Sequence, residues 1–240
     1  MLRRTARRRS AGLAALAFIL VVVVWQVPDL SALLYPFRFF VTTVHELGHG
    51  LAALATGGRF VGYQVYASGA GVATTTGGLS HVVIPAGYVG TALFGAALLY
   101  LTNRTPYTRT IAVLLGIGFA ALTVLFARSL TAILVGLLSA AALVLLGWKA
   151  PILLAAFALN FLAILTGLHA VLDLWGLLHS LDSAVLAGTN GVPNDAYNMA
   201  QAVPLLPPVG WAVLWIVLAL ALLALAAYYT FWFPFRRRAL

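Results

Sequence analysis

Long apolar runs separated by short polar breaks dominate the pattern of this chain. Seven runs stand out, at about 11–27, 31–56, 84–102, 110–127, 129–147, 151–178 and 209–233. A helix needs about 17–25 predominantly apolar residues to cross the hydrocarbon core of a bilayer, and each run is long enough. The pattern predicts an all-α integral membrane protein, with six or seven transmembrane helices in a single polytopic domain over residues 1–240.

The segment 57–83 interrupts this pattern directly after the second run. It alternates apolar residues with small or polar ones between pairs of glycines, which predicts a short β-hairpin or a re-entrant segment. Gly57 and Gly58 are expected to end the preceding helix. The two runs on either side of Arg128 are almost continuous and predict a tight helical hairpin or one broken helix. Residues 179–208 form a long polar connection, which we expect to be a loop.

Composition and charge agree with a membrane location. Of the 240 residues 63% are hydrophobic and only 8% are charged, against about 25% charged residues in soluble domains. The net charge of +9 comes mainly from arginines at the ends of the apolar runs, which is typical of anchoring at a membrane surface and argues against nucleic-acid binding. Cysteine is absent, which excludes disulfides, thiolate metal sites and cysteine nucleophiles.

The first apolar run resembles a signal peptide because basic residues precede it. No small-x-small cleavage pattern follows it, so we expect residues 11–27 to remain as an anchor helix. The five arginines before this run favour a cytoplasmic N-terminus. The domain then divides into this anchor, a core over about 31–180 and a C-terminal helix over about 209–233, in a multi-pass protein of the cell membrane.

A polar motif, "TTVHELGHGLAAL", lies inside the second run at residues 42–54. His45, Glu46 and His49 make the pattern H-E-x-x-H, and on a helix both imidazoles share one face and can reach one ion. Neutral imidazole is a good ligand for Zn²⁺, and the adjacent glutamate can act as general base on a zinc-bound water. Burying such groups costs about 2.5 kcal/mol or more each, which favours a metal site over a structural hydrogen bond between helices.

Two histidines leave a catalytic zinc site one protein ligand short. Asp173 lies inside the apolar run "AVLDLWG" and is the predicted third ligand. His169, four residues earlier on the same helical face, either orients Asp173 or replaces it as ligand. Asp29, Asp182 and Asp195 lie in polar or proline-containing connections, where we expect solvated side chains.

These features together resemble the site-2 protease family, whose members are zinc intramembrane metallopeptidases. The resemblance rests on H-E-L-G-H in an early membrane helix, the glycine-rich hairpin after it and an aspartate in a late helix. It is to the compact bacterial branch without a PDZ domain, in which "HELGHGLAALATGG" and "PAGYVG" (85–90) have counterparts. The resemblance covers most of residues 40–180.

The resemblance implies hydrolysis of peptide bonds within or beside the membrane. It implies zinc held by His45, His49 and Asp173, with Glu46 as the catalytic base. One departure concerns the family's second motif, which places Asn and Pro before an Asp-Gly pair. Here Leu174 follows Asp173, and no proline precedes it closely.

The sequence therefore predicts a zinc-dependent metalloprotease, embedded in the lipid bilayer, that cuts membrane-associated protein or peptide substrates. Segment 57–83 is expected to guide an unwound substrate by strand addition. One alternative is a membrane metal transporter or sensor, but most of the runs lack the polar residues that a transport path needs. The other is a catalytically inactive scaffold of the same fold, against which the intact Glu46 argues.

Overall fold

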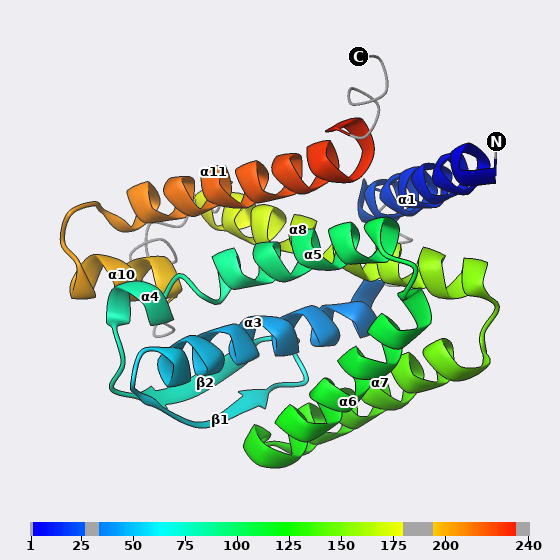
Figure 1. Ribbon diagram of the computed structural model, residues 1–240. Coiled ribbons are helices and arrows are strands. Elements are labelled where there is room, and N and C mark those ends of the chain that lie inside the picture. Colours follow the sequence, from blue (N-terminus) through cyan, green and yellow to red (C-terminus); the bar gives the residue numbers. More distant parts are fainter. Residues whose placement is uncertain (1, 27–33, 180–193, 234–240) are drawn as a thin grey trace.

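The computed structural model of the chain describes residues 2–26, 34–179 and 194–233. Figure 1 shows a helical protein in which α3 lies between a small β-hairpin and a layer made of α5, α8 and α11. Two of the aspartates that we expected to be solvated, Asp29 and Asp182, lie outside the described residues.

The helices follow the predicted apolar runs. The long ones are α1 (Leu2–Gln26), α3 (Tyr35–Ala55), α5 (Tyr88–Arg104), α6 (Thr108–Phe126), α7 (Leu130–Lys149), α8 (Ile152–His179) and α11 (Pro208–Ala227). The short ones are α4 (Ser80–Val83), α10 (Asp195–Ala202) and the π-helix η2 (Tyr228–Trp232). Within the described residues, four segments are long and apolar enough to cross a membrane, in α6, α7, α8 and α11 with η2. A total of six or seven spans stays a prediction.

Helices α6 and α7 form the tight hairpin predicted around Arg128, and Figure 1 shows them side by side. Small residues allow this close approach, because a Cβ atom at Gly116, Gly136 or Gly147 would collide with the neighbouring helix. The hydroxyl of Ser129 caps α7 by accepting a hydrogen bond from a backbone N–H three residues on.

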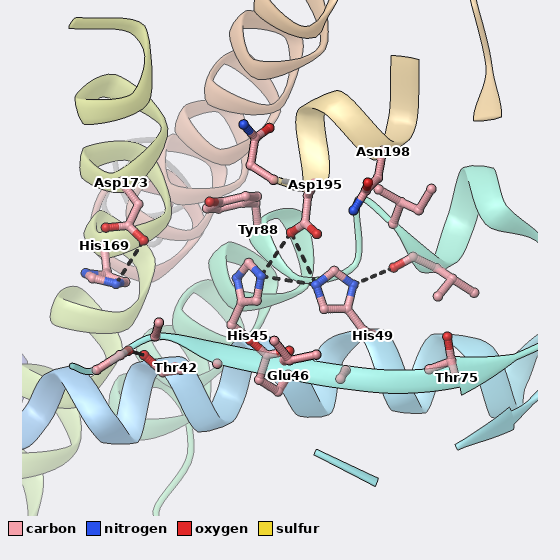
Figure 2. A pocket seen from close by; sticks show the side chains of 18 of the residues that line it. Thr42, His45, Glu46, His49, Thr75, Tyr88, His169, Asp173, Asp195 and Asn198 are labelled. Carbon is pink, nitrogen blue, oxygen red and sulfur yellow. Dashed lines mark hydrogen bonds and ion pairs between the residues drawn. The ribbon is translucent and has the colours of Figure 1, made fainter. Parts of the chain in front are cut away.

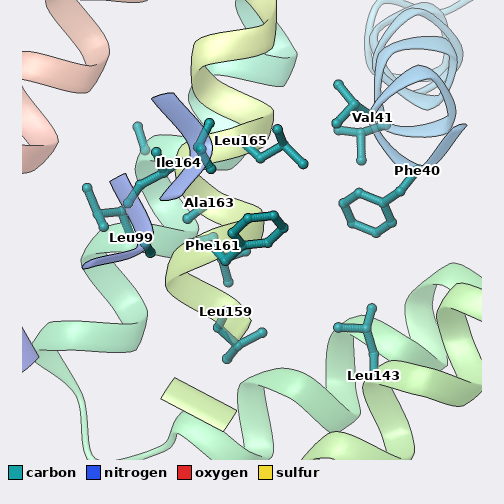
Figure 3. Packing of buried hydrophobic residues seen from close by; sticks show 14 of the residues in the cluster. Phe40, Val41, Leu99, Leu143, Leu159, Phe161, Ala163, Ile164 and Leu165 are labelled. Atoms are coloured by element: carbon teal, nitrogen blue, oxygen red, sulfur yellow. The ribbon is translucent and has the colours of Figure 1, made fainter. Parts of the chain in front are cut away.

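The main apolar core lies between α3, α5, α7 and α8 (Figure 3). Its labelled side chains are Phe40, Val41, Leu99, Leu143, Leu159, Phe161, Ala163, Ile164 and Leu165. A pair of asparagines crosses it: Asn103 Nδ2 of α5 donates to Asn160 Oδ1 of α8 over 2.6 Å, and Asn160 Nδ2 donates back to Asn103 Oδ1 over 3.4 Å. This core holds α3 and α8, the two helices that carry the predicted site residues, in a fixed relation.

The β-hairpin predicted for segment 57–83 is confirmed. Strands β1 (Arg59–Val65) and β2 (Gly71–Thr76) pair antiparallel, and Gly57 with a φ of 82° ends the preceding helix as expected. Strand β1 is fixed against the α6–α7 turn, since the fully buried Tyr63 accepts a backbone hydrogen bond from Arg128 over 2.8 Å. Strand β2 thereby lies along α3.

Part of the connection over 179–208 is helical, contrary to the expected loop. Helix α10 begins where Asn194 caps it by accepting a hydrogen bond from the backbone N–H of Tyr197 over 2.9 Å. The helix forms because its apolar face is buried against α8 and α11. The cluster that holds it consists of Leu174, Ala196, Met199, Trp211, Ala212, Trp215 and Ile216.

Candidate metal centre

A polar cavity of about 450 Å³ lies where α3, β2, α4, α5, α8 and α10 meet. Figure 2 shows the side chains that line it, which include both histidines of the H-E-x-x-H motif. A larger cavity of about 810 Å³ between α1, α3, α7 and α8 is almost entirely apolar, and no metal-ligating side chain lines it. The smaller cavity is therefore the candidate site, because it contains the histidines and carboxylates that the larger cavity lacks.

Two histidines from α3 and one aspartate from α10 meet in the polar cavity (Figure 2). His45 Nε2 lies 3.1 Å from Asp195 Oδ2, and His49 Nε2 lies 3.3 Å from the same oxygen. The two Nε2 atoms are 3.1 Å apart. The spacing of four residues along α3 thus places both imidazoles on one face, as the sequence predicts, and the fold adds a carboxylate.

The three donor atoms fit a tetrahedral zinc ion. Ligands about 2.0–2.1 Å from zinc in a tetrahedron lie about 3.3 Å from one another, close to the separations above. Two imidazoles and one carboxylate also form a donor set that zinc commonly takes. His49 Nδ1 lies 2.8 Å from the carbonyl oxygen of Val83 and can only donate to it, which leaves Nε2 free to bind a metal.

The electrostatics of Asp195 also suit a ligand. Burial alone would raise the pKa of its carboxyl group, but the charge of His49 and hydrogen bonds with both imidazoles outweigh this effect. The pKa is therefore held well below its usual range. This effect requires a protonated His49, whereas metal ligands must be deprotonated. A metal ion held by neutral imidazoles would supply the positive charge beside the carboxylate instead.

The turn between α4 and α5 closes over the histidines because its residues are small. A Cβ atom added at Gly87 would collide with Nε2 of both His45 and His49, and one added at Gly48 would collide with the carbonyl oxygen of Ala86. Glycine at these two positions lets the backbone approach the imidazoles. Part of the motif "PAGYVG" is thus explained by contact with the candidate metal centre.

Glu46 occupies the side of α3 that faces strand β2. The residue is only 5% exposed, and its carboxylate lies close to the backbone of β2. Gly71 leaves room for this carboxylate, since a Cβ there would collide with it. One turn earlier, the hydroxyl of Thr42 donates to the carbonyl of Gly69 over 2.8 Å. The hairpin therefore fixes the glutamate at the cavity.

The predicted third ligand, Asp173, lines the same cavity from α8 but does not join the two histidines. Its Oδ2 lies 3.4 Å from His169 Nε2, and in Figure 2 Tyr88 lies between this pair and Asp195. The three donor atoms within 4.8 Å of one another belong to His45, His49 and Asp195. Asp173 does not join the histidines of α3 because its carboxylate is paired with His169 on its own helix.

Asp195 is the site residue that the sequence reasoning missed, and its expected solvated role is wrong. Its side chain is only 22% exposed and contacts both histidines. A signal was present in "NGVPNDA" (190–196), where Asn and Pro precede an aspartate that a small residue follows. That order matches the second motif of the site-2 protease family more closely than the surroundings of Asp173 do, although alanine replaces glycine.

The comparison with protein families agrees with this geometry. A family model described as Peptidase M50B-like matches residues 13–226. The chain belongs to this family. Membership confirms the resemblance to site-2 proteases and implies a metallopeptidase, and with the four apolar helices it indicates an integral membrane protein. No curated protein and no solved structure matches the chain.

Proposed function

We propose that this protein is a zinc-dependent metalloprotease of the cell membrane that cuts membrane-associated protein or peptide substrates. The observation that carries the proposal is the meeting of His45, His49 and Asp195 at distances that suit metal ligands, with Glu46 next to His45 in sequence. In this proposal Asp195, rather than Asp173, is the third ligand. The family membership supports the reaction class.

The chain's own residues divide the chemistry between them. His45, His49 and Asp195 would hold the zinc. When bound, zinc lowers the pKa of a coordinated water and polarises a substrate carbonyl. Glu46 takes a proton from the attacking water and returns it to the leaving amine, a role worth about 10²–10⁴-fold in rate. Its carboxylate lies close against Gly71 of β2, which restricts where it can move between these two transfers.

The β-hairpin offers a way to present the substrate. A peptide bond inside a helix is shielded by its own hydrogen bonds, so the substrate has to unwind before attack. Strand β2 lies along the cavity and contacts Glu46, and an extended segment that adds to this strand would run past the metal centre. This is the role that the sequence predicts for segment 57–83.

The decisive experiment compares wild type with Glu46→Gln in detergent or nanodiscs, using labelled casein and single-span membrane proteins as substrates. We expect the variant to keep its zinc and to lose cleavage by about 10²–10⁴-fold. Gln64→Ala, at an exposed position of β1, is the matched control and should behave as wild type.

Two results would contradict the proposal. Loss of zinc in Glu46→Gln would make Glu46 a ligand and the mechanism wrong. Zinc-loaded wild type that cleaves no substrate, but moves metal into liposomes, would support the transporter alternative instead.

A further inference from the structure

A second pair of ionisable side chains lines the cavity and has no part in the proposed mechanism. His169 and Asp173 lie on α8, in a segment (Ile152–Gly176) whose mean hydropathy of 2.0 is high enough for a membrane span. Ionisable residues in such a segment are costly, and they usually mark a substrate or ion path. The pair therefore needs a function of its own.

The carboxylate of Asp173 is open to the cavity. Its side chain is 45% exposed, and its contact with His169 Nε2 is 3.4 Å long, which exceeds the usual 2.7–3.2 Å or so of an N–H···O hydrogen bond. One imidazole partner leaves most of the acceptor positions of a carboxylate free. Among the described residues no lysine or arginine forms an ion pair with Asp173. Arg38 lines the same cavity and attracts the carboxylate from a longer distance, while its side chain lies against Gly69 in the hairpin turn.

One aromatic side chain, Tyr88, lines the same cavity near enough to Asp173 to feel its charge. The ring of Tyr88 contacts the ring of His45 at a centroid distance of 4.6 Å and stacks on Trp215 at 6.0 Å. In Figure 2 the ring lies between the α8 pair and the metal centre. A carboxylate beside an aromatic ring is a combination that attracts an organic cation, the first by charge and the second through its quadrupole.

We propose that Asp173, His169 and Tyr88 form a substrate subsite for a lysine or arginine side chain near the scissile bond. An extended peptide advances about 3.3 Å per residue. A cavity of about 450 Å³ therefore holds only a short stretch of substrate, and the cation lies within a few residues of the cut. The inference rests on the proposed function and assigns its substrate preference.

The test uses acetylated and amidated, internally quenched apolar peptides in detergent, with one scanned residue as Lys, Arg, Gln or Glu. At one position, wild type should cleave the Lys and Arg peptides roughly 10- to 100-fold more efficiently than the Gln peptide, the range for a hydrogen bond to a charged group. In Asp173→Asn the ratio of cleavage efficiencies, Lys or Arg peptide over Gln peptide, should fall to about 2 or less, while the zinc content stays full. Asp173→Glu should restore much of this preference for a cation.

The outcomes distinguish a failure of the proposed subsite from a failure of the proposed protease function. Wild type that cleaves the peptides without preferring a cation at any position would overturn the subsite and leave the protease intact. Loss of zinc in Asp173→Asn would make Asp173 a metal ligand and also overturn it. A third outcome is that wild type prefers a Gln peptide with a free N-terminus over the acetylated Gln peptide, and shows no preference for Lys or Arg side chains. The subsite would then bind the terminal ammonium group of a substrate, and the proposal of a side-chain subsite would be wrong. Wild type that cleaves neither peptides nor proteins would remove the proposed function itself.

Discussion

Two histidine–aspartate groups line one cavity and differ in how they are assembled. Both contain a pair spaced by four residues on a helix, His45 with His49 on α3 and His169 with Asp173 on α8. On α3, a carboxylate from the distant helix α10 completes the group. On α8, no third side chain of the described residues forms an ion pair with the two partners. Helical spacing brings two donors to one face, but a third donor has to come from the tertiary fold.

The surroundings of the two groups differ in the same way. The backbone of the α4–α5 turn closes over His45 and His49, and Val83 fixes one ring through its carbonyl oxygen. Asp173 is instead 45% exposed and lines the cavity from α8. A closed group with three converging donors suits a metal ion. An open pair suits a ligand that enters and leaves.

The largest expected effect is on zinc affinity, which should differ between variants of Asp195 and Asp173. Asp195→Asn should weaken zinc binding by at least roughly 100-fold, because even the loss of an outer-shell partner costs 10–100-fold. Asp173→Asn should bind zinc as wild type does. Competition with a chelator of known affinity measures both, and thermal unfolding checks the folding of each variant. The reverse result, with zinc lost from Asp173→Asn alone, would restore the ligand predicted from the sequence.

The sequence predicted the α3 half of this comparison because its information is local. The H-E-x-x-H spacing fixes the shared face of His45 and His49, and the glycine pairs and alternation fix the hairpin. The positions of the long helices followed from the apolar runs for the same reason, although α1 begins at Leu2, ahead of its apolar run.

The sequence did not predict that Asp195 lies beside the two histidines, because its position depends on a distant contact. Asp195 reaches the histidines only when the apolar face of α10 docks on Trp211 and Trp215 of α11. The periodicity of apolar residues within the polar connection does not predict that α10 packs against α11. Asp173 looked favourable because a carboxylate in an apolar helix needs a partner, but that partner, His169, is on its own helix.

A steric change at the closed group should have a smaller but clear effect. Gly87→Ala places a methyl group against Nε2 of both His45 and His49, so we expect zinc affinity to fall by roughly 10-fold or more, as for lost support of a ligand. Gly118→Ala in α6, where a Cβ meets no atom within 4 Å, is the control. It should keep its zinc and gain stability, since alanine favours a helix by about 0.5–1 kcal/mol. Equal zinc affinity in both variants would contradict the close approach of the α4–α5 turn.

The smallest effect is expected for His169→Gln, in a comparison with the same substitution at His49. His49→Gln removes a proposed ligand and should lose the zinc, whereas His169→Gln should keep it. Because His169 only orients the carboxylate of Asp173, its loss removes one hydrogen bond, worth about 0.5–1.5 kcal/mol. The preference for a Lys over a Gln peptide should therefore fall by roughly 2- to 10-fold, less than in Asp173→Asn. Metal analysis and the ratio of kcat/KM for the two peptides measure this. Zinc loss in His169→Gln would show that the two groups act as one metal centre.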